Sequence, residues 1–140
     1  SLPLLDVVQA LEPIIEQVQP RRVYTHHRGD LNVDHRVTHK AVMTACRPAP
    51  GCSVREILTF EVMSSTEWAT PGSNPFVPNA FINSSEYLPK KLEALAAYDM
   101  EMRPAPHSRS IAHVEVLARH RGNSVGFIAA EAFELVRIIE

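Results

Sequence analysis

The sequence predicts a single α/β domain, residues 1–140, built around a mostly parallel sheet. Helical and β-rich segments alternate along the chain, and parallel strands need crossover connections, which are usually helices. Apolar residues make up 45% of the composition, enough for one buried core. Only three convincing strands are visible, and the chain opens on a helix where such folds usually open on a strand. We therefore expect a sheet that is incomplete at the N-terminus.

The spacing of apolar residues places the expected elements. From Leu4 to Val18 they recur at three- and four-residue steps, which indicates an amphipathic helix that Pro13 should kink or end early and Pro20 should close. Further helices are expected over residues 34–47, 86–98 and 108–121, and strands over residues 22–26, 54–63 and 134–139.

Local signals indicate where these helices begin and end. Asp30 or Asn32 is expected to cap the second helix, a serine at 84 or 85 the third, and Gly122 is expected to stop the fourth. Residues 64–83 are rich in Pro, Ser, Asn and Gly and are expected to form a long loop. Loops of this length in compact domains are usually functional or mobile.

Charge and hydropathy argue against several partners. The formal net charge is −2 with scattered Lys and Arg, so no basic stripe is present for nucleic acid or an anionic membrane. The sequence contains neither an apolar run of about eighteen residues nor a basic leader. We expect a cytoplasmic chain with no membrane partner. Cys46 and Cys52 fit no common zinc or redox motif and are expected to be ordinary thiols.

The stretch from Val23 to Lys40 concentrates the chemistry. A short β-branched strand runs into four histidines and two aspartates within fourteen residues, the density of a metal or acid–base site. His35 and His39 are four residues apart on the expected helix, so both point to one face and such a pair can chelate zinc. The pair alone is weak evidence. His26, His27 or Asp30 would strengthen a metal site.

A bland interpretation of the same stretch is that some of these residues cap the helix. Asp34 in the first helical turn is favoured by the helix dipole whatever its chemistry.

The residues Arg21 to His39, with T-H-H, G-D-L-N and D-H-R in order, resemble the second motif of the PIG-L or LmbE-like zinc-dependent N-deacetylases. The segments E-I-L-T-F-E-V, K-K-L-E-A-L-A-A-Y and H-S-R-S follow in the order that this family shows. The resemblance implies a three-layer, Rossmann-like (LmbE-like) fold. It also implies zinc-dependent removal of an N-acetyl group from an amino sugar or conjugate, of the N-acetylglucosamine type.

The resemblance assigns roles to three residues of the motif. His35 corresponds to a zinc ligand of the family, and Asp34 to the aspartate that orients a catalytic histidine. Asn32 stands where that histidine is expected. An amide can donate a hydrogen bond to an oxyanion but cannot deliver a proton, so the acid is left open between His26, His27 and a zinc-bound water.

The sequence departs from the family in lacking an A-H-P-D-D-E motif, which supplies two further zinc ligands and the base. Catalytic zinc normally has three protein ligands. We therefore expect the C-terminal part of a deacetylase, inactive as this isolated chain. It is either a truncated product, or part of a protein with an N-terminal segment outside the given sequence, or an independent unit without its zinc site. Association with such a segment, or a homo-oligomer, is expected.

Two other functions remain open, a non-catalytic, self-associating α/β module and a zinc-dependent hydratase or lyase on the same scaffold. For the deacetylase, Trp68 and Asn79 in the long loop are expected to bind a small-molecule sugar substrate, because aromatic rings pack on sugars and amides bond hydroxyls. Arg109 is a third candidate substrate residue. The competing interpretations are that Trp68 pins a surface loop and that Arg109 is solvated.

Overall fold

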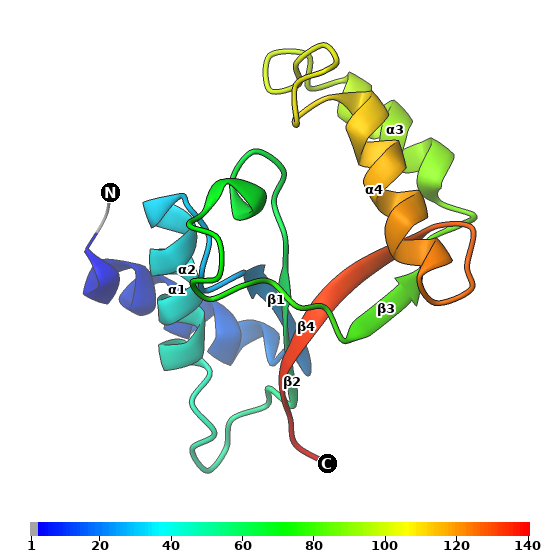
Figure 1. The fold of residues 1–140 in the computed structure, drawn as a ribbon. Helices are drawn as coiled ribbons and strands as arrows, with labels where there is room; N and C mark the ends of the chain where they lie inside the picture. Colours follow the sequence, from blue (N-terminus) through cyan, green and yellow to red (C-terminus); the bar gives the residue numbers. More distant parts are fainter. Residues whose placement is uncertain (1–2) are drawn as a thin grey trace. The chain divides into compact units, whose positions relative to one another are not determined.

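The computed structural model describes residues 3–140 (Figure 1). Its elements, in chain order, are α1 (Leu4–Val18), β1 (Arg22–His26), α2 (Val33–Ala45), β2 (Glu56–Phe60), the 3-10 turn η1 (Thr66–Trp68), β3 (Ala80–Asn83), α3 (Leu88–Ala96), α4 (Ile111–Asn123) and β4 (Ala130–Ile138). The chain divides into two compact units. The first contains the described residues up to Val77 together with Phe133–Glu140, and the second is Pro78–Ala132. The single domain stays a prediction.

The strands form a four-stranded sheet in the order β1-β2-β4-β3. β1 and β2 are parallel, with Arg22 opposite Glu56 and His26 opposite Phe60. β2 and β4 are antiparallel. The α/β class is confirmed, whereas the mostly parallel sheet is corrected to a mixed one. Residues 61–129 form a loop and the second unit rather than a single crossover helix, so β4 enters beside β2 from the opposite direction.

The core of the first unit lies between its two helices and the parallel strands. Its buried centre is Val42, Cys46, Val54 and Ile57, against which Leu11, Ile15, Val23, Met43 and Cys52 pack. α1 contributes apolar residues at three- and four-residue steps, the spacing that predicted it. The parallel register brings the C-terminal ends of β1 and β2 together, and the polar residues that follow the two strands therefore meet at one edge.

α1 continues through Pro13 to Val18, which corrects the expected early end, while the kink stays a prediction. A proline in a helix leaves the carbonyl four residues before it without its helical hydrogen bond. That carbonyl belongs to Gln9, and both residues are exposed, so water can satisfy it. The helix ends at Val18, and Gln19 follows in the left-handed conformation (φ 52°).

The second unit contains α3 and α4 around Leu88, Ala118 and Ala129. Gly122 does not stop α4, which runs to Asn123. A Cβ at Gly122 would lie 2.5 Å from the Cα of Ala129, so glycine is required there for close packing.

The N-terminus of α3 also differs from its prediction. The helix begins at Leu88 without a serine cap, since Tyr87 occupies the N-cap position and makes no side-chain cap hydrogen bond. The Ser85 hydroxyl donates to the Asn83 side chain. Pro89 lies in the first turn, as expected. Within the predicted loop 64–83 the structure adds η1 and the short strand β3, whose four residues are too few to show a clear alternation in the sequence.

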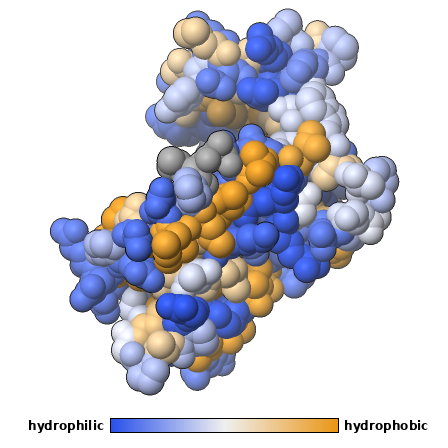
Figure 2. Space-filling model, turned by 90° about the vertical axis from the view of Figure 1, so that its left-hand side faces the viewer, coloured by the Kyte–Doolittle hydropathy of each residue, from blue (hydrophilic) through white to orange (hydrophobic). Residues whose placement is uncertain are grey.

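Several apolar side chains of the first unit remain exposed. On α1 they include Leu5, Ile14 and Val18, which are 63%, 55% and 64% exposed. Figure 2, which views the side of the molecule where α1 and α2 lie, shows a band of apolar surface. Among the described residues, no helix has both the length and the apolar character needed to cross a membrane.

Replacing Ile57 by alanine tests the importance of this core. Its side chain is 0% exposed, and truncating a buried isoleucine costs about 2–5 kcal/mol because packing is lost and a cavity remains. We expect a loss of this size in urea unfolding. Ile14→Ala on the exposed side of α1 is the matched control and should cost far less. Equal losses would place the stabilising core elsewhere.

Candidate metal and catalytic site at the end of β1

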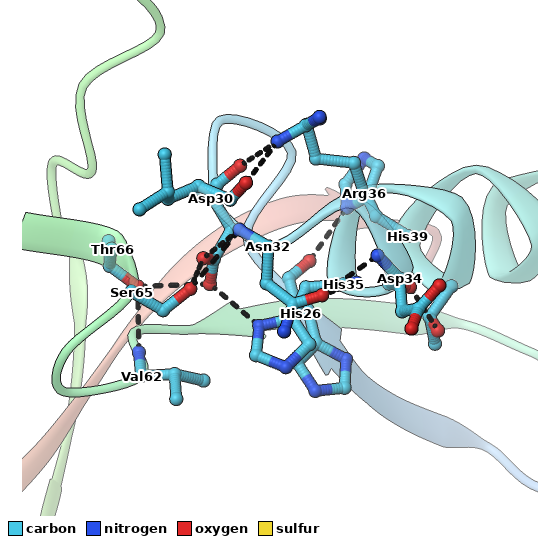
Figure 3. Close-up of polar contacts among 12 residues, drawn as sticks. His26, Asp30, Asn32, Asp34, His35, Arg36, His39, Val62, Ser65 and Thr66 are labelled. Atoms are coloured by element: carbon cyan, nitrogen blue, oxygen red, sulfur yellow. Dashed lines mark hydrogen bonds and ion pairs between the residues drawn. The ribbon is translucent and has the colours of Figure 1, made fainter. Parts of the chain in front are cut away.

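The site lies where β1 ends and α2 begins. Asn32 caps α2, and its side-chain Oδ1 accepts hydrogen bonds from the main-chain N–H groups of Asp34 (2.8 Å) and His35 (3.4 Å). The expected cap is therefore confirmed at Asn32. Because the cap fixes the first turn of the helix, it also fixes the position from which His35 projects (Figure 3).

His35 has one ring nitrogen held and the other available. Its Nδ1 lies 3.1 Å from Oδ2 of Asp30. An ionised carboxylate only accepts hydrogen bonds, so Nδ1 carries the proton in this pair. In the neutral imidazole the Nε2 lone pair is then free to bind a ligand. A carboxylate that orients a histidine in this way is the usual outer partner of a metal-binding imidazole.

The carboxylate of Asp30 is buried and is the centre of the polar network in Figure 3. It accepts hydrogen bonds from the Ser65 hydroxyl, the Thr66 hydroxyl (3.2 Å) and the main-chain N–H of Asn32 (3.2 Å), in addition to His35. Burial alone would raise the pKa of Asp30, but these hydrogen bonds outweigh it and hold the pKa below its ordinary value. Asp30 is therefore ionised at neutral pH.

His26, the last residue of β1, stacks on His35. The ring centroids are 4.2 Å apart and the planes differ by 23°. Burial is the main cause that lowers the pKa of His26, and its interaction with the neighbouring His35 ring acts in the same direction. Burial therefore favours the neutral form of the His26 imidazole.

The two remaining histidines make main-chain contacts. Nδ1 of His39 donates to the carbonyl of His26 at 2.9 Å, and burial lowers the pKa of His39. His27 is 1% exposed, and its Nε2 donates to the carbonyl of Asn74 at 2.7 Å. The structure therefore brings His26, Asp30, Asn32 and His35 together, while His27 and His39 each direct a ring nitrogen to the backbone.

The other residues for which the sequence predicted a role are Asp34, Trp68, Asn79 and Arg109, and they lie in different parts of the structure. Asp34 is exposed, and its main chain bonds the Asn32 side chain and the Thr38 hydroxyl. It is Asp30 that bonds the ring of His35. Trp68 lies in η1 of the first unit, 53% exposed. Asn79 and Arg109 belong to the second unit, where Arg109 pairs with Glu101 at 3.4 Å; their contact with substrate stays a prediction.

Sequence reasoning missed Ser65 and Thr66, whose hydroxyls hold Asp30 in place. A signal for them was present. They follow β2, which is parallel to β1, and the residues after adjacent parallel strands meet at the same edge of the sheet.

The fit of this site to zinc is partial. His35, oriented by Asp30, suits one ligand position. Among the residues that the structure describes, no group of three or more His, Cys, Asp or Glu side chains is placed to hold a metal ion. Catalytic zinc normally requires three protein ligands. The described residues therefore supply one ordered ligand position and do not form a complete shell.

Comparison with known proteins agrees with this picture. Residues 2–46 match the PIG-L family, described as GlcNAc-PI de-N-acetylase. The chain is 37% identical over 100 residues to the "Uncharacterized deacetylase YaiS" of Escherichia coli K12, an alignment that covers 67% of this chain and 48% of the relative. The chain thus spans about half the length of the curated relative that it matches.

Solved structures share the fold at low sequence identity. The conserved protein TT1542 of Thermus thermophilus has a TM-score of 0.71 and 20% identity, with 100% of this chain and 61% of that chain covered. The N,N'-diacetylchitobiose deacetylase of Pyrococcus horikoshii has a TM-score of 0.71 and 16% identity, covering 98% and 54%. The 4-carboxy-2-hydroxymuconate hydratase GalB of Pseudomonas putida KT2440 has a TM-score of 0.69 and 21% identity, covering 96% and 60%.

The α/β fold of this chain is of the LmbE-like type. Within that class, the resemblance of this chain to the PIG-L and LmbE-like deacetylase family is confirmed. The family match includes the strand, the cap and His35.

Replacing Asp30 by asparagine tests the network around His35. The new amide turns a donor toward groups that already donate, and each buried unsatisfied group costs about 1–3 kcal/mol. We expect a loss of stability in that range, measured by urea unfolding. Asp34→Asn on the same segment is the control and should lose less than about 1 kcal/mol, the size of a helix-dipole contact. Similar losses would show that Asp30 has no special structural role.

His39 should make stability depend on pH. Its pKa in the fold is lowered from 6.5, so below that pH the unfolded chain binds more protons than the folded chain, and stability falls as pH drops through this window. His39→Asn retains a donor near the Nδ1 position but cannot titrate. Urea unfolding between pH 7.5 and 5.5 should show a shallower pH dependence for the variant. An unchanged slope would contradict the assignment.

Proposed function

We propose that this chain carries part of the active site of a zinc-dependent N-deacetylase, an enzyme that hydrolyses the N-acetyl amide of an amino sugar or sugar conjugate. The observation that carries the proposal is the His35–Asp30 pair, which leaves the Nε2 lone pair of His35 available at the end of β1. The family match and the deacetylase relative support it.

Each residue of the site has a role in this proposal. His35 is the zinc ligand, and a zinc ion held there would supply Lewis acidity to the acetyl carbonyl. Asp30 holds the imidazole in the required tautomer. Asn32 caps α2 through its Oδ1, so its side-chain N–H groups are the part that remains to meet a developing oxyanion. Asp34, exposed in the first turn, is a further catalytic candidate.

The remaining zinc ligands and the base belong, in this proposal, to residues outside the given sequence, either in a preceding segment of the same protein or in an associated chain. The count of ligands supports this, since one imidazole alone does not hold catalytic zinc. The exposed apolar residues of α1 are compatible with association, including a homo-oligomer.

The substrate class is a small molecule with an N-acetylated sugar. The pyrococcal neighbour is a diacetylchitobiose deacetylase, which supports this class for the shared fold. Trp68 presents an exposed aromatic face in the first unit, suited to packing on a sugar ring. Asn79 and Arg109 are proposed to contribute hydrogen bonds to hydroxyl groups. We also propose that the protein acts in the cytoplasm.

A hydratase is the second candidate, because the fold of GalB is similar. The two reactions are separated by product. Deacetylation releases acetate and a free amine, whereas hydration consumes a conjugated double bond without releasing either.

The test measures zinc content and acetate release from N-acetylglucosamine conjugates, for the 140-residue chain and for a longer form that supplies the remaining ligands. We expect the isolated chain to be inactive and the longer form to release acetate in a zinc-dependent manner. His35→Ala should abolish this release, and Asp30→Asn should weaken zinc affinity by about 10–100-fold, as is typical when an outer partner of a ligand is lost.

His39→Asn is the matched control, because it removes an imidazole from the same helix without touching the His35–Asp30 pair. It should retain zinc and activity. Equal zinc affinity and acetate release in wild type and His35→Ala would refute the proposal, whereas hydration of a conjugated acid without acetate release would favour the second candidate.

A further inference from the structure

His27 connects the end of β1 to the long loop that follows β2. The side chain is 1% exposed, and its Nε2 donates to the main-chain carbonyl of Asn74 at 2.7 Å. The same ring packs edge-to-face on Phe76, with centroids 5.3 Å apart at 84°. Two contacts, one polar and one apolar, therefore hold this part of the loop against a buried side chain.

Two further features hold the same segment. Oε1 of Glu134, on β4, accepts the main-chain N–H of Val77 at 2.9 Å. It also lies 3.3 Å from Nδ1 of His27, within ion-pair range but without the alignment of a hydrogen bond. At Gly29, a Cβ would lie 2.3 Å from the carbonyl oxygen of Asn74. The loop thus comes so close to the β1–α2 connection that no side chain fits between them.

The beginning of the loop is held at the other end of the same connection. The hydroxyls of Ser65 and Thr66 bond Asp30, which lies three residues after His27. Residues 67–73, which we call the strap, are therefore tied on both sides to the short connection 27–32. The strap includes Trp68, the chain's single tryptophan, which is 53% exposed.

We propose that His27 is a positioning residue that fastens residues 74–77 and so fixes the strap as the element that determines sugar specificity at this site. The fastening follows from the contacts of His27, Glu134 and Gly29 alone. The contact between the strap and a sugar rests on the proposed function. This role also removes His27 from the candidates for the catalytic acid, since its Nε2 proton is committed to Asn74.

The test compares three variants by amide exchange at Val77 and by the nanosecond anisotropy of Trp68. His27→Leu removes the donor and should speed exchange at Val77 by at least about tenfold and increase local motion of Trp68. His27→Gln keeps a donor near the Nε2 position and should restore most of the protection. Amides in the middle of α2 serve as the internal control and should not change.

Gly29→Ala perturbs the same contact while keeping the His27 side chain. Its added Cβ would overlap the Asn74 carbonyl and lie 2.9 Å from Nε2 of His27, so it should release residues 74–77 and change Trp68 as His27→Leu does. If His27→Leu fails to fold, Gly29→Ala and His27→Gln still decide the question.

Wild-type exchange at Val77 and unchanged Trp68 anisotropy in both His27→Leu and Gly29→Ala would overturn the fastening. In the active longer form, the variants should raise KM for N-acetylated sugars at least about threefold more than they lower kcat, because fewer substrate contacts are preorganised. If residues 74–77 are released in the variants but KM does not change in this way, the proposed role of the strap in sugar specificity would be overturned. Absence of any deacetylase activity in wild type would instead count against the proposed function and leave the fastening result intact.

Discussion

The buried carboxylate of Asp30 is the interaction on which the candidate site depends. Removing a carboxylate from water is costly, and the cost is met here by hydroxyl, main-chain and imidazole donors from three segments of the chain. The same contacts connect the end of β1, the first turn of α2 and the beginning of the loop after β2. The carboxylate of Asp30 thereby fixes both the ring of His35 and one end of the strap. The local conformational preferences of any one segment would not hold these two parts of the chain together.

Much of the fold could be predicted where local signals and tertiary packing agree. The strand at residues 22–26 and the cap at Asn32 follow from β-branched composition and capping chemistry and are found in the structure. Pro13 and Gly122 were expected to interrupt a helix because both residue types have low helix propensity. Pro13 is tolerated inside α1 at an exposed position. Gly122 lies inside α4 because only glycine fits against Ala129. The antiparallel pairing of β4 depends on long-range connectivity, which periodicity does not contain.

The sequence predicted that these polar residues cluster in one site, but it did not predict which of them form hydrogen-bonded pairs. The sequence placed two aspartates near His35, and the family resemblance assigned a catalytic role to Asp34. On a helix, however, consecutive residues point in different directions, and a residue in the preceding turn can reach back across the cap. Asp30 occupies that place and bonds Nδ1 of His35, with Ser65 and Thr66 completing its environment. Their pairing with Asp30 requires the parallel register of β1 and β2.

Contacts within the chain orient the ring of His35. Small zinc domains often fold only when the metal binds, because nothing else holds their ligands. Here the hydrogen bond to Asp30 and the stacking on His26 hold the imidazole through contacts of the chain itself. In the same stretch, His27 donates its Nε2–H and His39 its Nδ1–H to a main-chain carbonyl. In the proposed function, the His35 ring needs little further ordering to bind a ligand, because the hydrogen bond to Asp30 and the stacking on His26 already hold it.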